Sequence, residues 1–145
     1  PPPLAELEKR AGKSWALGTL LEQLKKGEKT EPRLFQISTW VFGDDLAMVF
    51  MSDEVVVDYV LRLKREMDGS RLWITAYTND VSCYIASKRI LDEGGYEARN
   101  SLSNLISYGE PERVQPAMED RIIQRIGELL PETFKIEKGD AALFR

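Results

Sequence analysis

The sequence predicts an α/β fold, a mixed sheet with a β-hairpin and flanking helices that forms part of a larger catalytic domain. Three observations lead to this prediction. Segments with helical periodicity occur among short segments in which apolar residues alternate or run together, as in strands. A Gly-Asp-Asp turn joins the first two strand segments. A helix-length segment then separates the second strand from the third, which is typical of a crossover between parallel strands.

The length and composition fit one globular domain. The chain has 145 residues, of which 43% are hydrophobic and 30% charged. We expect a single domain over residues 1–145, with a frayed lead-in at residues 1–13, which are proline-rich and then highly charged. Because the chain starts with three prolines and its first methionine is Met48, we also expect it to be a segment of a longer protein.

Charge and metal-ligand content exclude several classes of function. The net charge is −4 and no Lys/Arg cluster stands out, so nucleic acid is not an expected partner. Cys83 is the only cysteine and the chain has no histidine. These counts exclude a disulfide framework and a complete histidine- or cysteine-based zinc site within this chain.

The first half of the chain predicts a helix followed by a β-hairpin. Ser14 suits the cap of a helix with apolar residues at helical spacing, and Gly27 stops it. Residues 35–42 alternate as in a half-buried strand. Residues 46–51 are a continuous apolar run, typical of a strand buried on both faces. Residues 43–45 predict the hairpin turn between them.

A crossover helix and a third strand follow the hairpin. Ser52 or Asp53 is expected to cap a helix that runs to about Met67 and ends at the Asp-Gly pair of residues 68–69. Residues 71–77 alternate again and predict the third strand. Since the helix joins the second strand to the third, we expect these two strands to be parallel.

Two further helices are predicted in the rest of the chain. Residues 87–93 form a short helix that closes on the two glycines of residues 94–95. Residues 96–115 are expected to be mostly irregular. Residues 116–130 predict the last helix, because proline suits its first turn. Its expected inward positions are Met118, Ile122, Ile126 and Leu129.

Polar segments follow two of the expected strands, where open α/β sheets usually bind ligands. One segment spans residues 51–54 and the other residues 77–84. If the two strands are neighbours, both segments face one space. The side chains offered there are Asp53, Glu54, Asn79, Asp80 and Tyr84, with Tyr96 as a further candidate. Helix capping, turn formation and ordinary packing of the tyrosines also explain these residues one by one.

Several short segments carry a family resemblance through their order and spacing. They are Phe-Gly-Asp-Asp-Leu-Ala at 42–47, Glu-Val-Val-Val-Asp-Tyr at 54–59, Tyr-Thr-Asn-Asp-Val at 77–81, Tyr-Ile at 84–85 and Gly-Gly-Tyr-Glu at 94–97. Together they resemble the C-terminal part of the catalytic domain of the neutral/alkaline (non-lysosomal) ceramidase family. The resemblance covers roughly residues 33–130, and no single motif in it is specific.

The resemblance implies an activity and a site. The family uses one zinc ion to hydrolyse the N-acyl amide of ceramide, a lipid amide, to sphingosine and a fatty acid. Two histidines from earlier in the chain, a glutamate and a tyrosine hold the zinc. By resemblance, Glu54 and Tyr84 are the metal ligands in this chain. Tyr96 is the catalytic tyrosine that helps to hold the oxyanion, and the resemblance implies a secreted or cell-envelope protein.

Two departures from the family affect these expectations. Ser52-Asp53 stands where the family usually has a small pair such as Pro-Gly, and this chain lacks the histidines. We therefore expect a missing N-terminal part of the catalytic domain to be a partner and the isolated chain to be inactive. Two alternatives stay open. One is a non-catalytic structural or interaction domain that kept the fold, and the other is an amidase for another N-acyl lipid.

The site assignment and the expected partner both predict geometry. If Glu54 and Tyr84 share a metal, their oxygens must lie within about 3–5 Å of each other. Tyr96 should point to the same space. Of the acidic residues, Asp80 is expected to lie nearer to it than Asp44 or Asp58. A chain that packs against a missing part should also expose an uncovered sheet face or edge, or self-associate.

Overall fold

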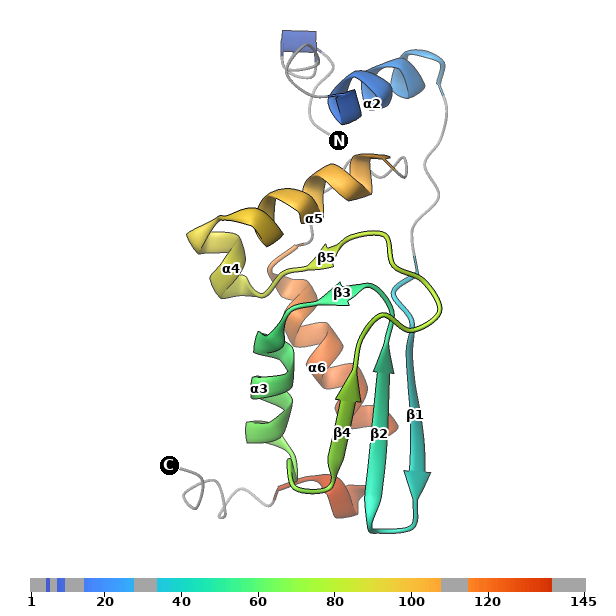
Figure 1. Ribbon diagram of the computed structural model, residues 1–145, viewed down its shortest axis with the longest axis vertical. Coiled ribbons are helices and arrows are strands. Elements are labelled where there is room, and N and C mark those ends of the chain that lie inside the picture. The colour runs from blue at the N-terminus through green and yellow to red at the C-terminus, as the bar shows by residue number, and fades with distance from the viewer. Residues whose placement is uncertain (1–4, 6–7, 10–14, 28–33, 108–114, 137–145) are drawn as a thin grey trace.

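The structure is a computed structural model that describes residues 5, 8–9, 15–27, 34–107 and 115–136. The cap predicted at Ser14 and most of the expected lead-in at residues 1–13 lie outside the described residues. The elements follow one another as shown in Figure 1. They are α2 (Trp15–Lys25), β1 (Ile37–Phe42), β2 (Leu46–Met51), β3 (Glu54–Val55), α3 (Val57–Glu66), β4 (Leu72–Thr75), β5 (Tyr84–Ile85), α4 (Lys88–Glu93), α5 (Tyr96–Ser107), α6 (Ala117–Leu129) and a 3-10 turn (Glu132–Phe134).

The predicted α/β fold and mixed sheet are confirmed. The main sheet has the strand order β1-β2-β4, and β1 and β2 form an antiparallel hairpin in which Trp40 faces Met48. Strands β2 and β4 are parallel, with Val49 opposite Ile74, and α3 is the crossover between them. The short strands β3 and β5 form a second, parallel pair beyond the end of the main sheet (Figure 1).

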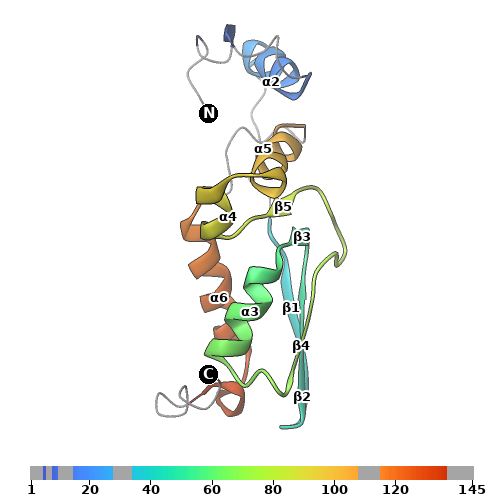
Figure 2. The same cartoon turned by 60° about the vertical axis from the view of Figure 1, so that its left-hand side comes forward.

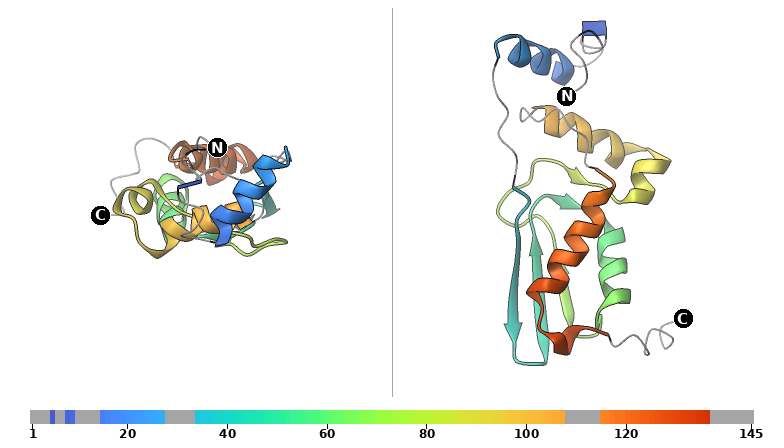
Figure 3. Two further views of the ribbon diagram at one scale, coloured as in Figure 1. Left: turned by 90° about the horizontal axis from the view of Figure 1, so that it is seen from above. Right: turned by 180° about the vertical axis from the view of Figure 1, so that it is seen from behind.

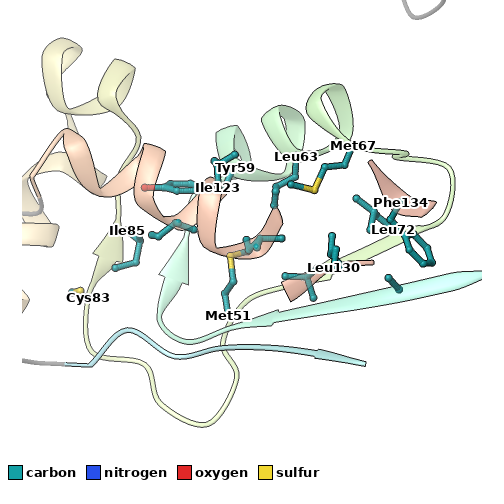
Figure 4. Packing of buried hydrophobic residues seen from close by; sticks show 14 residues of the cluster. Met51, Tyr59, Leu63, Met67, Leu72, Cys83, Ile85, Ile123, Leu130 and Phe134 are labelled. Carbon is teal, nitrogen blue, oxygen red and sulfur yellow. The ribbon is translucent and has the colours of Figure 1, made fainter. Parts of the chain in front are cut away.

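The core lies between one face of the main sheet and the helices α3 and α6, which cover the same side (Figure 2). Strand β2 directs Ala47, Val49 and Met51 into this core, where each is at most 1% exposed. Tyr59 of α3 and Ile126 of α6 meet them from the helix layer and are fully buried. Figure 4 shows this packing, with Phe134 of the 3-10 turn closing the far end of the cluster.

The opposite face of the sheet is strongly apolar, and no described helix covers it (Figures 2 and 3). Because paired residues share a face, Trp40 of β1, Met48 of β2 and Trp73 of β4 form one row across the three strands. Trp40 and Trp73 are 61% and 60% exposed. Phe50 packs beside Trp40, with ring centroids 5.2 Å apart. The expected uncovered sheet face is therefore confirmed, whereas the prediction that residues 46–51 are buried on both faces is wrong.

Two element boundaries differ from the sequence prediction. Helix α3 begins at Val57, after Val56 in an extended conformation, and neither Ser52 nor Asp53 caps it. The reason is that residues 54–55 pair with β5 and so keep an extended backbone. In the segment predicted to be irregular, residues 96–107 form α5 instead. Among the α5 side chains that the structure describes, the buried ones are small: Ala98 is 1% exposed and Ser101 is fully buried.

The last helix is confirmed as α6, and its Ile122 and Ile126 are buried as predicted. Ile123 is buried too, while Met118 and Leu129 are half-buried at the edge of the core. Within the part of the chain that the structure describes, no helix has the length and apolar character needed to cross a membrane.

Candidate functional site

The candidate site lies where β2 and β4 bend together into β3 and β5. In this second pair Glu54 is the direct partner of Tyr84 and Val55 the partner of Ile85. The Glu54 amide donates to the Cys83 carbonyl at 3.0 Å, and the Val56 amide donates to the Ile85 carbonyl at 3.3 Å. Because paired residues of a sheet point to the same face, Glu54 and Tyr84 side chains lie side by side.

Unusual backbone conformations produce the bend. Asp53, Tyr77 and Asn79 have φ angles of 65°, 60° and 68°, in the left-handed region that non-glycine residues rarely adopt. Backbone hydrogen bonds tie the two bends to each other. The Tyr77 amide donates to the Asp53 carbonyl at 3.0 Å, and the Thr78 amide donates to the Met51 carbonyl at 3.1 Å. The two polar segments are thus joined at one end of the sheet, as predicted.

A carboxylate surrounded by phenols forms the centre of the site. Glu54 is half-buried, and side-chain hydrogen bonding to its carboxylate raises the pKa of Tyr84 to about 12. The same interaction raises the pKa of Tyr77. Tyr96, the first residue of α5, stands edge-on to Tyr84 with ring centroids 5.6 Å apart and planes at 78°. Loss of a phenol proton would place a second negative charge beside this carboxylate, which is why the phenols lose their protons less readily.

The structure therefore pairs Glu54 with Tyr84 and packs Tyr96 against Tyr84. The expected separation of about 3–5 Å between the Glu54 and Tyr84 oxygens stays a prediction. Their roles as ligands and catalytic residue stay predictions. The sequence interpretation missed Tyr77, because the alternation of residues 71–77 placed it at the end of a strand. A signal was present in the adjacent Thr-Asn-Asp turn sequence, which indicates that the strand has already ended and that Tyr77 belongs to the bend.

A cavity of about 480 Å³ opens beside this cluster, between β3 and α4. Its lining includes Glu54, Tyr77, Tyr84, Asp58, Arg89 and Glu93. Arg89 donates to the carboxylate of Asp58 at 2.9 Å and to that of Glu93 at 2.7 Å. Hydrogen bonding from Arg89, and less strongly from Ser87, holds the pKa of Asp58 below its ordinary value despite partial burial. Arg89 thus neutralises part of the negative charge of the acidic side chains that line the cavity.

The acidic residue expected nearest to the site is not the one that lines it. Asp58 lines the cavity, and Asp80 is not among its lining residues. Which of the two carboxylates lies nearer to Glu54 and Tyr84 stays a prediction. Polar groups of residues 78–83 form hydrogen bonds with other segments of the same chain. Asn79 donates through Nδ2 to Gln36 Oε1 at 3.2 Å, and the Asp80 carbonyl accepts from the Asp53 amide at 2.8 Å.

The donors in the cluster fit one side of a zinc site. A glutamate carboxylate and a tyrosine phenolate are both oxygen donors that zinc accepts, and the pairing of Glu54 with Tyr84 places them next to each other. Among the described residues, however, no group of three or more His, Cys, Asp and Glu side chains gathers where a metal ion could sit. The described part of the chain can supply the oxygen ligands of such a site but not its nitrogen ligands.

The fold and the Glu54–Tyr84–Tyr96 cluster are observations from this structure alone. No protein-family model, no curated protein and no solved structure matches the chain.

Proposed function

We propose that this chain is part of a zinc-dependent amidohydrolase that cleaves the N-acyl amide of ceramide into sphingosine and a fatty acid. The observation that supports the proposal most is the direct pairing of Glu54 with Tyr84, thirty positions later in the sequence. A zinc ligand set of this kind requires these two oxygens side by side, and helix capping alone places no such demand on them.

In this proposal Glu54 and Tyr84 hold the zinc, and histidines outside this chain complete its coordination. Bound zinc would polarise the amide carbonyl and lower the pKa of a coordinated water. Glu54 would supply negative charge to the metal. Tyr84, whose pKa is about 12 beside the Glu54 carboxylate, would lose its phenol proton to solvent on binding the metal, since its oxygen binds a metal best as phenolate. Tyr96 would donate a hydrogen bond to the amide oxygen as negative charge develops there.

The uncovered sheet face is consistent with a chain that packs against further protein. The row of Trp40, Met48 and Trp73 is of the kind usually buried in a domain interior or a stable interface. In the proposal, the part of the catalytic domain that carries the histidines is the partner. A different N-acyl lipid amide would fit the same chemistry.

One observation favours a non-catalytic alternative. The Glu54 carboxylate raises the pKa of both Tyr84 and Tyr77, so the cluster also fits a structural junction in which the phenols keep their protons. In that case the chain is an interaction domain, and the cluster stabilises the bend between its two small sheets. Activity and metal content of the complete protein separate these two functions.

The decisive experiment measures zinc content and hydrolysis of a fluorescent ceramide by the protein from the complete reading frame. We expect Glu54→Gln and Tyr84→Phe to lose zinc and to lower kcat/KM by roughly 100-fold or more, since each removes a metal ligand. Tyr77→Phe is the matched control, because Tyr77 shares the hydrogen bond to Glu54 but is not a proposed ligand. It should keep the zinc and most of the activity.

The outcomes distinguish the alternatives. Full zinc and activity in Glu54→Gln would overturn the proposed ligand set. A complete protein without zinc or amidase activity would favour the interaction domain. Hydrolysis of N-acyl lipids with another head group, in preference to ceramide, would keep the mechanism and change the substrate.

A further inference from the structure

Asp53, next to the proposed ligand Glu54, is buried in an unusual way. Its side chain is 1% exposed, although a buried carboxylate is costly unless it is hydrogen-bonded. The carboxylate accepts from the Ser82 amide at 3.0 Å, from the Ser82 hydroxyl at 2.8 Å and from the Ser52 hydroxyl at 3.0 Å. These bonds connect the start of β3 to the residue two places before Tyr84.

The backbone of Asp53 holds the same segment at two more points. Its amide donates to the Asp80 carbonyl at 2.8 Å, and its carbonyl accepts from the Tyr77 amide at 3.0 Å. Ser52 extends the connection to the start of β1, since it donates through its amide to the Gln36 carbonyl at 3.0 Å. Asp53 therefore fixes the positions of Tyr77, Asp80 and Ser82 relative to the end of β2.

This connection matters because the two short strands β3 and β5 make few backbone bonds to each other. It acts together with the burial of Ile85 in the core and with the bond from the Ser101 hydroxyl to the Tyr84 carbonyl. Each of these strands has two residues, and residues 76–83 separate β5 from β4, so the register of β2 and β4 is not carried over. A slip of one residue would turn the Tyr84 side chain to the opposite face of the pair, away from Glu54. The bonds to Ser82 oppose such a slip.

The backbone conformation indicates that the side chain itself is needed. Asp53 has a φ of 65°, a conformation that glycine adopts without strain and that aspartate adopts less readily. Such strain persists only where the surroundings determine it. The hydrogen bonds of the carboxylate are the compensating contribution that glycine could not make.

We propose that Asp53 is a positioning residue, which sets the register of β5 against β3 and thereby holds Tyr84 opposite Glu54. The inference rests on the proposed function only where it calls that pair a metal site. The register itself is a property of this chain, and its test requires neither metal nor substrate.

The test compares Asp53→Gly with Asp53→Asn in the 145-residue chain by NMR. Glycine keeps the backbone conformation and removes the carboxylate. Asparagine also tolerates this conformation, accepts from Ser82 through Oδ1 and donates to the Ser52 hydroxyl. The readouts are the nuclear Overhauser contact between the Tyr84 ring and Glu54, and hydrogen exchange of the Glu54 amide, which donates to Cys83. The Ala47 amide, which donates to Arg71 in the main sheet, reports on the rest of the fold.

In Asp53→Gly we expect the Tyr84–Glu54 contact to be lost and the Glu54 amide to exchange at least tenfold faster, while the exchange rate of the Ala47 amide stays unchanged. In Asp53→Asn we expect both the contact and the slow exchange of the Glu54 amide to be retained. A retained contact in Asp53→Gly, or equal acceleration at Glu54 and Ala47, would overturn the proposal. If Asp53→Gly does not fold, Ser82→Ala decides the question. It removes one bond to the carboxylate and should accelerate Glu54 selectively, and unchanged exchange there would count against a positioning role.

Discussion

Glu54 and Tyr84 are direct partners in the β3–β5 pair, and the Glu54 carboxylate raises the pKa of the Tyr84 phenol to about 12, chiefly through side-chain hydrogen bonding. The contact depends on two chain bends that occur side by side, at Asp53 and at Tyr77. Because both bends leave parallel strands at the same end of the sheet, they carry the two side chains to one place.

The Glu54 carboxylate should control the titration of Tyr84. Glu54→Gln removes the negative charge, so the pKa of Tyr84 should fall from about 12 toward its ordinary value of 10.0. NMR of protein labelled at the tyrosine Cζ would measure it, with Tyr84→Phe to assign the signal. Glu93→Gln is the matched control, because Glu93 lines the same cavity but pairs with Arg89.

The raised pKa of Tyr84 also makes the stability of the fold depend on pH in the alkaline range. A pKa that is higher in the folded chain means that the interaction contributes stability fully below the unfolded value of about 10. This stability is lost as pH rises through about 12. An unaltered Tyr84 titration in Glu54→Gln would contradict the assignment of the hydrogen bond.

The 145-residue chain alone should not bind zinc tightly. Glu54 and Tyr84 are two oxygen ligands, and structural or catalytic zinc in proteins normally has at least three protein ligands. Isothermal titration calorimetry should therefore detect no tight one-to-one binding near neutral pH. A stoichiometric, tight site would show that this chain completes the coordination by itself and that outside histidines are unnecessary.

The uncovered sheet face should cause self-association of the isolated chain. Trp40 and Trp73 lie in one row and are more than half exposed, so burying them against another copy removes apolar surface from water. Light scattering after size exclusion should show an average mass that rises with concentration. Replacing both tryptophans by lysine should shift the chain toward monomer.

Leu61→Lys is the control for that experiment, because Leu61 is 55% exposed but lies on α3. It should leave the association unchanged. A native chain that remains monomeric at high concentration would argue against the apolar face as an interface.

Asp58 should stabilise the fold near neutral pH and lose this contribution in acid. Its pKa is held below the ordinary value of 3.8, chiefly by hydrogen bonding from Arg89. A depressed pKa contributes stability above the unfolded value, and this contribution is lost as pH falls through the folded value. We expect Asp58→Asn to lower the free energy of unfolding by about 1 kcal/mol near neutral pH and to cost less in acid.

Urea denaturation at about pH 6 and about pH 3 would measure the difference. Asp45→Asn, in the exposed hairpin turn, serves as control and should change neither value appreciably. An equal loss of stability in Asp58→Asn at both pH values would mean that its ionisation is not the source of the effect.

Local patterns in the sequence predicted several elements well. Residues 46–51 were expected to be a strand and form β2 with the same limits, because a turn sequence precedes them and apolar residues fill them. The parallel pairing of β2 with β4 followed from the helix-length segment between them. The last helix was predicted from the spacing of its isoleucines, which fixes the face that packs on the sheet.

Features that depend on distant partners could not be predicted in the same way. The chain at residues 52–55 was assigned to a helix, because its polar residues match a capping pattern. The structure keeps it extended, since Glu54 and Val55 find partners in Tyr84 and Ile85. Likewise, a continuous apolar run does not tell which side of a strand is covered, and only the placement of α3 and α6 leaves one face of β2 half-buried.

The sequence by itself therefore determined the α/β class, the hairpin, the crossover and the absence of histidine ligands, because turn chemistry, periodicity and composition are local properties. It also placed Glu54, Tyr84 and Tyr96 as candidates in one region, because polar segments follow two strands expected to be neighbours. Only the tertiary structure decided that Glu54 and Tyr84 face each other and that Tyr77 joins them. The register of two strands thirty residues apart depends on hydrogen bonds across the bend, such as those of Asp53 to Ser82, which no local pattern encodes.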